Sequence, residues 1–491
     1  MAASQPSIAV SKPQVMAQPN AVEIVEVCKV APPPAAISVP SPKSLPLTFF
    51  DIRWLRLPPY EILFFYEVST PNSSSSFFFD SILPRLKHSL SLALLHFLPL
   101  AGNITWPPTS PKPGVEYSDG VLMTVAMSND ADFCRLSGSD IFCEATEYHP
   151  LIPKLSASHE RVAVLALQVT LFPNQGFSIG IIMHHAVLDG KSLHMFLKSW
   201  AYICRSLGHG DCIDGQDQST IFLQLPSELK PVYDRDCIKD PADLGTIFSN
   251  QWRNIDGLDN RSLVPWEVQK IQPGSVRGTF QMPREKIEKL KRLVRDKKME
   301  NDKDNKQQFP IIHVSTFSLT YAYMLACLAK AEEVIDDNIS FVFVMDLRSR
   351  FEPPIPKTYF GNCVADKVTV VEREALLGKE GLIVALRAIS EAIKGLEKGP
   401  LNGAQNWVSS DKLKASALRT YSIASSPRFE AYSTDFGWGR PRKVDVSSID
   451  KKGAISLSDN RNGNGVEIGL VLRKHHMEAF ASLFAEGLES L

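Results

Sequence analysis

The spacing of apolar residues predicts alternating helices and strands along most of the chain. From Phe79 to Phe97, apolar side chains recur every three or four residues, which is typical of an amphipathic helix packed on a core. Val162–Gln168 and Phe177–Met183 are short apolar runs on either side of the turn-forming sequence Pro-Asn-Gln-Gly, and they favour two buried strands. Ser192–Leu207 predicts a helix that begins shortly after the second strand.

The second half of the chain shows the same mixture. The pattern predicts helices at Arg284–Lys298, Ser315–Glu332 and His476–Leu488, and buried strands at Ile339–Met345 and Val466–Leu472. A chain of 491 residues is too long for one compact core. Helices and strands that alternate in both halves, without an obvious internal repeat, therefore indicate two α/β domains.

Changes in composition suggest where these domains begin and end. Residues 1–20 are rich in Ala, Ser, Gln and Pro and bury too little apolar surface to order themselves, so we expect a disordered tail, with Met16 as an alternative start. A polar stretch rich in Gly, Asp and Gln marks a crossover linker at 208–225. The N-terminal domain is then 21–207 and the C-terminal domain 226–491, part of which we expect to pack onto the N-terminal domain.

Charge and cysteine content exclude several classes of protein. The net charge is −1, so no global field attracts nucleic acid or an anionic membrane. The N-terminus lacks the blocks of a signal peptide, and the longest apolar stretch is too short for a bilayer span, so we expect a cytosolic protein. Eight cysteines without a Cys-x-x-Cys pair argue against a zinc site and a disulfide framework. We expect reduced thiols and no bound metal.

A candidate general base follows the second buried strand of the first half. His185 and Asp189 stand four residues apart, a spacing at which an Asp can hold the loop while the imidazole takes a proton from an alcohol. His184 is the rival, but only His185 has an Asp four residues on, and we expect His184 to face the other way. A His-x-x-x-Asp pattern arises by chance in a chain of this length, so alone it favours a buried structural histidine.

Two further segments change that balance. With His185, Asp189 and Gly190 they resemble the plant acyl-CoA-dependent acyltransferases of the BAHD family, whose signatures are His-x-x-x-Asp-Gly and Asp-Phe-Gly-Trp-Gly. The second signature is matched by Asp435, Phe436, Gly437, Trp438 and Gly439. The clade that malonylates flavonoid and phenolic glucosides has a third, matched by Tyr359, Phe360, Gly361, Asn362 and Cys363. The resemblance extends from Leu47-Thr48-Phe49-Phe50-Asp51 to the end of the chain.

The resemblance implies a fold and a site. The fold is α/β, with two chloramphenicol acetyltransferase-like domains joined by a crossover loop and an active-site channel at their interface. His185 is the implied base. Asp189 could polarise His185 as in a catalytic triad, but the resemblance implies that it pairs with an arginine, for which Arg348 is our candidate. Gly190 is expected to adopt a backbone conformation closed to other residues. The Asp435–Gly439 loop is implied to be structural and remote from the reacting centre.

Contacts to the substrates are expected at five further positions. Alignment on the Asp-Phe-Gly-Trp-Gly motif brings Ser425, Ser426 and Arg428 near the centre as oxyanion or acyl contacts. Ser315 and Thr316 open a helix whose amides could bind a phosphate or pantetheine of coenzyme A, although ordinary capping explains them as well.

Three other groups of residues are candidates for further roles. The basic residues from Lys286 to Lys298 could bind phosphate, although a solvated helix face explains them equally. Thr48 and Asp51 are expected to line the acceptor side. Cys363 could be a nucleophile, but a lone cysteine is more often buried packing.

The function expected from the resemblance is transfer of malonyl from malonyl-CoA to a sugar hydroxyl, the glucose 6-hydroxyl, of a flavonoid, anthocyanin or other phenolic glucoside. We expect the transfer to take place in a ternary complex of the enzyme and both substrates, with acyl-CoA as co-substrate and no permanent cofactor. We expect the enzyme to be a monomer. The alternative within the class is a coumaroyl or caffeoyl donor. Alternatives of other classes are a catalytically dead protein that binds CoA esters or phenolics, and a thioesterase.

Overall fold

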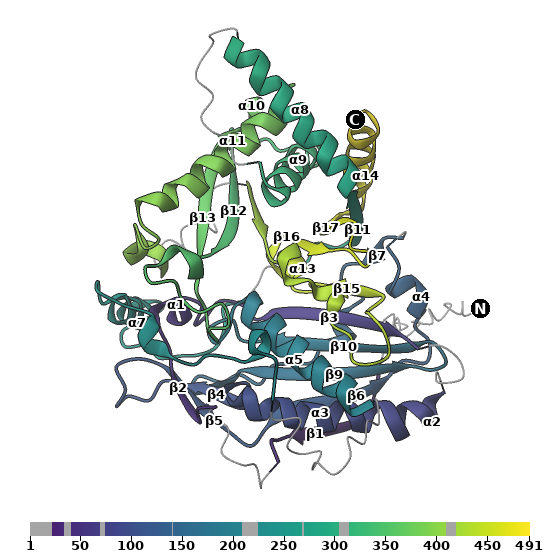
Figure 1. Ribbon diagram of the computed structural model, residues 1–491, viewed down its shortest axis with the longest axis vertical. Coiled ribbons are helices and arrows are strands. Elements are labelled where there is room, and N and C mark those ends of the chain that lie inside the picture. The colour runs from purple at the N-terminus through teal and green to yellow at the C-terminus, as the bar shows by residue number, and fades with distance from the viewer. Residues whose placement is uncertain are drawn as a thin grey trace, which may run out of the picture.

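The computed structural model describes residues 22–33, 41–68, 74–139, 141–208, 224–267, 270–303, 314–408 and 419–491. Two stacked parts make up the described chain, a lower one mostly from the first half and an upper one mostly from the second (Figure 1). The predicted tail 1–20, including Met16, and most of the predicted linker, 209–223, lie outside the described residues.

A six-stranded sheet organises the lower part. Every residue of its two central strands, β9 and β10, is buried, as their continuous apolar runs predict. Helices α3 (Leu83–His96) and α5 (Gly190–Gly208) pack against each other, and Trp200 Nε1 donates to the Leu86 carbonyl at 3.2 Å. The strand order is β1 (Glu23–Val30), β6 (Val121–Met127), β9 (Leu165–Phe172), β10 (Gly176–Met183), β3 (Tyr60–Glu67) and β15 (Lys443–Asp445).

One predicted strand, Val162–Gln168, proves to be two. Arg161–Ala163 forms β8 in a separate four-stranded sheet with β2 (Ser44–Pro46), β5 (Gly114–Tyr117) and β4 (Gly102–Thr105). The chain then passes to the main sheet, with Val164 N donating to the Gly102 carbonyl at 3.1 Å. A continuous apolar run reports burial but not a change of sheet, so the pattern could not reveal this break.

A seven-stranded sheet organises the upper part. Its order is β13 (Val364–Glu372), β12 (Asn338–Asp346), β14 (Arg419–Ile423), β16 (Ala454–Asp459), β17 (Gly465–Arg473), β11 (Ser275–Pro283) and β7 (Cys143–Glu144). The longer helices beside it are α8 (Arg284–Lys303), α9 (Thr316–Ala331), α11 (Gly381–Lys394) and α14 (Lys474–Glu489) (Figure 1). Every helix and strand predicted for the second half is present.

Shorter helices lie in the connections. They are α1 (Phe49–Ile52), α2 (Ser75–Phe77), α4 (Phe133–Leu136), α7 (Leu244–Asn254), α10 (Arg373–Leu377) and α13 (Ile449–Lys452). The helix predicted from Phe79 begins with a π-helical turn at Phe78–Ile82 and continues as α3.

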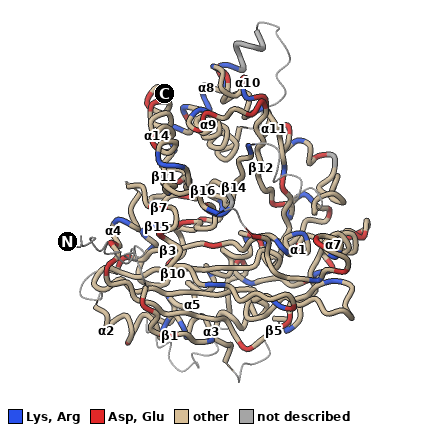
Figure 2. Tube along the Cα trace, turned by 180° about the vertical axis from the view of Figure 1, so that it is seen from behind, with Lys and Arg blue, Asp and Glu red and all other residues tan. Residues whose placement is uncertain are grey.

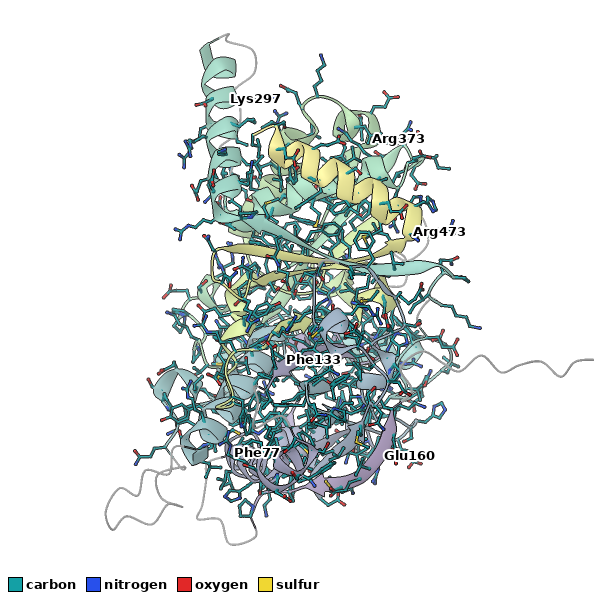
Figure 3. All side chains as sticks on the ribbon, turned by 90° about the vertical axis from the view of Figure 1, so that its right-hand side faces the viewer. Phe77, Phe133, Glu160, Lys297, Arg373 and Arg473 are labelled. Atoms are coloured by element: carbon teal, nitrogen blue, oxygen red, sulfur yellow. The ribbon has the colours of Figure 1, made fainter. Side chains whose placement is uncertain are left out.

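Each part contributes one strand to the sheet of the other part. β15 pairs antiparallel with β3, with Lys443 opposite Phe65, and β7 pairs antiparallel with β11, with Glu144 opposite Val276. The buried Arg277 of β11 reinforces this junction by donating from Nη1 to Asp445 Oδ1 at 2.9 Å. Figure 3 shows side chains filling the space around Phe133, where the parts meet. The two halves of the sequence are therefore not independent units.

Charged residues are distributed over both parts. Lys and Arg alternate with Asp and Glu along the trace and do not gather on one side (Figure 2). Among the described residues, no helix combines the length and apolar character that a membrane span requires.

Candidate active site

The turn between β10 and α5 carries the candidate base. β10 ends at Met183 and α5 begins at Gly190, so His184 to Asp189 form the connection. His184 is completely buried, and burial lowers its pKa to about 3, so this ring stays neutral. Its Nδ1 accepts from Ala186 N at 3.2 Å, which stabilises the turn. His185 is partly exposed, and of the two it is the one that a substrate can reach.

An indole ring covers one face of His185. Trp54, which follows α1, stacks on the imidazole with the ring centroids 4.0 Å apart and the planes inclined by 16°. The guanidinium carbon of Arg53 lies 5.1 Å from the ring centroids of both Trp54 and Trp407, and Arg53 forms an ion pair with Asp366. Sequence reasoning missed Trp54, whose only signal is its position beside the Leu47–Asp51 motif. The stacked indole restricts rotation of the imidazole.

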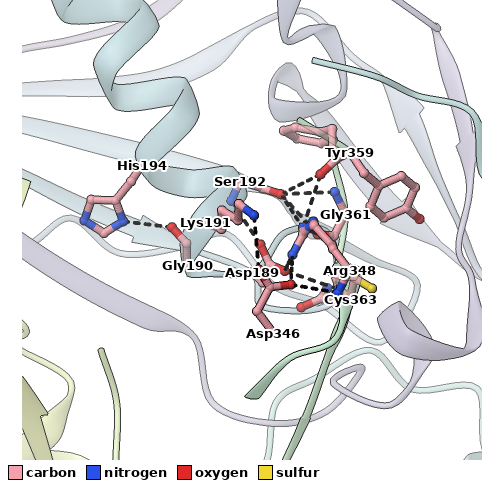
Figure 4. A network of polar contacts seen from close by, with 12 residues as sticks. Asp189, Gly190, Lys191, Ser192, His194, Asp346, Arg348, Tyr359, Gly361 and Cys363 are labelled. Carbon is pink, nitrogen blue, oxygen red and sulfur yellow. Dashed lines mark hydrogen bonds and ion pairs between the residues drawn. The ribbon is translucent and has the colours of Figure 1, made fainter. Parts of the chain in front are cut away.

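Asp189 is held by Arg348, as predicted (Figure 4). Its Oδ2 lies 2.8 Å from Arg348 Nη1 and accepts from Cys363 N at 3.2 Å, while Oδ1 accepts from Ser192 N at 2.9 Å. Burial would lower the pKa of Arg348, but the carboxylates of Asp189 and Asp346 outweigh that effect and raise the pKa, so the guanidinium stays charged. Both oxygens of Asp189 are occupied. This carboxylate therefore fixes the turn that carries His185.

The reason for a glycine at position 190 differs from the prediction. Gly190 has no positive φ, so the expectation of a special backbone conformation was wrong. It is the first residue of α5, and a Cβ there would lie 2.7 Å from two ring carbons of Phe429. Close approach of the Phe429 ring, and not backbone freedom, favours the glycine. Gly361 differs, because its φ is +147° and its missing Cβ also leaves room for the Arg235 guanidinium.

The Tyr359–Cys363 segment packs directly against the turn from His184 to Asp189. Arg348 Nη2 donates to the carbonyls of Tyr359 at 3.2 Å and Gly361 at 3.1 Å, so the arginine that holds Asp189 also holds this segment (Figure 4). Tyr359 and Phe360 are buried. Cys363 is fully buried, and burial raises the pKa of its thiol, which disfavours the nucleophile reading.

Asp51 does not line an acceptor site. Its side chain is fully buried, so it cannot contact a substrate in this structure, and the expectation for it was wrong. Each of its carboxylate oxygens accepts hydrogen bonds from the surrounding chain, from Thr48 on one side and Asn362 on the other. Thr48 is used as the N-cap of α1.

The Asp435–Gly439 loop packs at the far end of the strand that carries His185. Trp438 packs edge-on against Phe177, at the start of β10, and Phe436 packs against Trp200. Asp435 Oδ1 accepts from the amides of Gly437 and Gly439, both of which have positive φ. Six residue steps of extended chain separate Phe177 from Met183, the last residue of β10 before the turn with His185, a span of roughly 20 Å at about 3.3 Å per residue. The loop is structural, as the resemblance implied.

The serines expected at the coenzyme side already have partners within the protein. Ser315 caps α9 by accepting from Ser318 N at 3.0 Å, and Thr316 is the first residue of that helix. Ser425 Oγ donates to the Leu457 carbonyl at 2.7 Å, and Ser426 Oγ accepts from Arg428 N at 3.3 Å. Arg428 is exposed.

A small cavity adjoins these serines. It has room for about one water molecule, and Ser425 and Ser426 line it together with His194.

The basic face of α8 is largely paired. Lys289 lies 3.4 Å from Glu285, Lys291 lies 2.7 Å from Glu288, and Lys286 donates to the Leu488 carbonyl at 2.6 Å. These contacts favour the solvated helix face over a phosphate site.

A partly exposed candidate base lies between two α/β parts. This arrangement is suited to moving an acyl group onto a hydroxyl, which is the chemistry of an acyltransferase. A family model described as "Transferase family" matches residues 33–486. Because this match covers most of the chain, and a 39% identical relative is named a BAHD acyltransferase, the chain belongs to this family, the BAHD acyltransferases.

Several individual relatives align with this chain over nearly its whole length. The chain is 38% identical over 485 residues to phenolic glucoside malonyltransferase 1 of Arabidopsis thaliana, covering 96% of this chain and 98% of the relative. It is 39% identical over 486 residues to the malonyl-CoA:anthocyanidin 5-O-glucoside-6''-O-malonyltransferase of the same plant, covering 96% and 99%. A coumaroyl-CoA:anthocyanidin 3-O-glucoside-6''-O-coumaroyltransferase from that plant is 35% identical, covering 95% and 97%.

Solved structures share the fold. The crystal structure of vinorine synthase matches 94% of this chain and 98% of its own with a TM-score of 0.63 at 21% identity. That of F. sporotrichioides TRI101 complexed with coenzyme A and T-2 matches 89% and 97% with a TM-score of 0.56 at 14% identity. The two-part α/β architecture predicted from the sequence is confirmed. The two anthocyanidin relatives are named for transfer from malonyl-CoA and coumaroyl-CoA, and the TRI101 structure holds coenzyme A.

Proposed function

We propose that this enzyme transfers malonyl from malonyl-CoA to a sugar hydroxyl, the glucose 6-hydroxyl, of a flavonoid, anthocyanin or other phenolic glucoside. Relatives named as malonyltransferases of phenolic and anthocyanin glucosides, aligned over nearly the whole chain, support the donor and the acceptor class. The observation that carries the chemistry is the partly exposed His185 on a turn that the Asp189–Arg348 ion pair locks.

His185 acts as the general base. It removes the proton from the sugar hydroxyl as that oxygen attacks the thioester carbonyl, forming a C–O bond. The tetrahedral intermediate then collapses, the C–S bond breaks, and His185 returns the proton to the departing sulfur, which leaves as free coenzyme A. No acyl-enzyme forms in this scheme, because the buried Cys363 thiol has a raised pKa and cannot compete as a nucleophile.

The coenzyme binds on the side of α9 and the loop after β14. The first amides of α9, at Ser315 and Thr316, offer the partial positive charge of a helix N-terminus, and the exposed Arg428 adds a cation for a phosphate or a carboxylate. Ser426 contributes a hydroxyl near the acyl group, and Ser425 keeps the loop on β16 through Leu457.

The test is a matrix assay. Purified protein is incubated with malonyl-, acetyl- and coumaroyl-CoA, each crossed with phenolic glucosides and their aglycones, and the products are scored by mass spectrometry. A site that hydrogen-bonds sugar hydroxyls should reject the aglycone by on the order of 10³-fold or more, since its polar groups are otherwise left unpaired. Malonyl-CoA should exceed acetyl-CoA by about 10- to 150-fold through its carboxylate.

Each other outcome selects another function. Preference for coumaroyl-CoA, as in the 35% identical coumaroyltransferase, would replace the donor, and efficient acylation of an aglycone would replace the acceptor. Free malonate without an acylated product would identify a thioesterase. Binding without turnover would identify a catalytically dead binding protein.

The enzyme is further proposed to act as a monomer in the cytosol. In the part of the chain that is described, seven cysteines are present as free thiols, which is usual for a reducing compartment. Light scattering of the purified protein and imaging of a tagged chain test these two proposals.

A further inference from the structure

Two sequence motifs that the acyl-transfer chemistry does not use meet behind the catalytic turn. Asp51 belongs to the Leu47–Asp51 segment and Asn362 to the Tyr359–Cys363 segment, 311 residues later in the chain. Both side chains are fully buried. A buried carboxylate and a buried amide are costly to place unless they are fully bonded, so their contacts show what they hold.

Asp51 is a fixed anchor. Its Oδ2 accepts from Thr48 N at 2.9 Å and from Thr48 Oγ1 at 2.8 Å, and its Oδ1 accepts from Asn362 N at 2.9 Å. The guanidinium of Arg235 balances the charge, with Nη1 at 3.7 Å from Oδ2. Such a carboxylate has little freedom to move, because each displacement breaks a charge-assisted hydrogen bond.

Asn362 connects this anchor to the catalytic residue. Its Nδ2 donates one hydrogen to Asp51 Oδ1 at 3.0 Å and the other to the backbone carbonyl of His185 at 2.8 Å. The orientation of the amide is determined, since the flipped amide would place its oxygen against two acceptors. Asn362 Oδ1 is buried and has no hydrogen-bond partner among the described residues.

The same segment also holds the ring of His185. Trp54, three residues after Asp51, stacks on the imidazole at 4.0 Å between centroids. Asn362 thus holds the carbonyl of His185 while Trp54 restricts its ring. Asp189 holds the other end of the turn through its ion pair with Arg348. As a carboxylate it cannot donate a hydrogen bond to the His185 carbonyl.

We propose that Asp51 and Asn362 form a positioning pair that sets the backbone of His185, so that its imidazole faces the acceptor hydroxyl. The inference rests on the proposed function, because it assigns the pair to the general base of that reaction. Asn362 touches no substrate, and its effect passes through His185. Misplacing a base by about 1 Å can cost on the order of 10²-fold in rate, so removing the amide should lower kcat strongly.

The experiment compares Asn362→Ala with a matched control, Gln168→Ala. Gln168 on β9 is also buried, and its Nε2 also donates two hydrogen bonds, to the Pro150 carbonyl at 2.7 Å and to Thr170 Oγ1 at 3.1 Å. Both variants lose equivalent polar contacts and should show similar falls in Tm. Only Asn362→Ala should lower kcat, by roughly 10- to 100-fold, with KM for acyl-CoA within about threefold of wild type.

A double variant separates positioning from general damage. If Asn362 acts through His185, adding Asn362→Ala to His185→Ala should leave the residual activity unchanged, whereas independent effects would multiply. Should Asn362→Ala not fold, Asn362→Ser keeps one donor and should lose less activity, again without a change in KM. An Asn362 variant with wild-type kcat, a Gln168→Ala with the same loss of kcat, or multiplying effects in the double variant would overturn the proposal.

The two proposals fail in different ways. Measurements use the best donor and acceptor pair from the matrix assay, so a different donor refutes only the malonyl assignment. A wild-type protein that transfers no acyl group to any acceptor refutes both.

Discussion

Replacing Asp189 by asparagine separates a structural carboxylate from a catalytic one. The carboxylate lies 2.8 Å from Arg348 Nη1, and both side chains are about 2% exposed. In the variant, Oδ1 can still accept from Ser192 N, but the new amide group then faces two donors, Arg348 Nη1 and Cys363 N. The arginine is left as a buried charge whose remaining carboxylate partner is the half-exposed Asp346.

The size of the effect follows from that burial. Removing one partner of a buried ion pair costs about 3–5 kcal/mol. With an unfolding entropy of about 2.1 cal/mol/K per residue, a chain of 491 residues shifts by roughly 1 °C per kcal/mol, so Tm should fall by about 3–5 °C. The catalytic turn loosens with it, so kcat should drop by about 10²-fold or more.

The assay pairs thermal unfolding with kinetics at a temperature well below both Tm values. His185→Ala is the control, since it should lose activity while keeping its Tm within about 2 °C. An Asp189→Asn protein with wild-type Tm and no activity would instead assign Asp189 to a proton-sharing triad. A variant with both properties unchanged would refute the structural role as well.

Three further predictions concern single side chains. His185→Ala should lower turnover by at least about 10²-fold with coenzyme A binding retained, and turnover within tenfold of wild type in a coupled assay would reject the base. Cys363→Ala should stay active, and an acylated cysteine trapped with donor alone would show the opposite. Burial raises the pKa of Glu467 from 4.5 to about 7, although Tyr432 donates to it at 2.7 Å. A raised carboxyl pKa means that the folded state holds the proton more tightly, so this group's contribution to stability falls as pH rises from about 4.5 to 7. The free energy of unfolding of Glu467→Gln should therefore rise relative to that of wild type by up to about 3 kcal/mol between pH 4.5 and 8. A difference in unfolding free energy that does not change with pH would contradict this prediction.

Local pattern determined most of the helices and strands, and the family resemblance singled out His185 as the candidate base. Apolar periodicity reports which face of a segment is buried, so α3, α9 and α14 followed from their own residues. The pairing of Asp189 with Arg348 came from family resemblance, and the structure confirms it. These features depend on residues close in sequence or on motifs that keep their spacing.

Only the tertiary structure decided how these pieces meet. The exchange of β7 and β15 between the two sheets, the stacking of Trp54 on His185, and the link from Asp51 through Asn362 to the His185 carbonyl all join residues more than a hundred positions apart. No local period encodes such contacts, because they exist only once distant elements have packed. Gly190 shows the same limit: its sequence neighbours suggested a backbone requirement, but the ring of Phe429, 239 positions away, supplies the constraint.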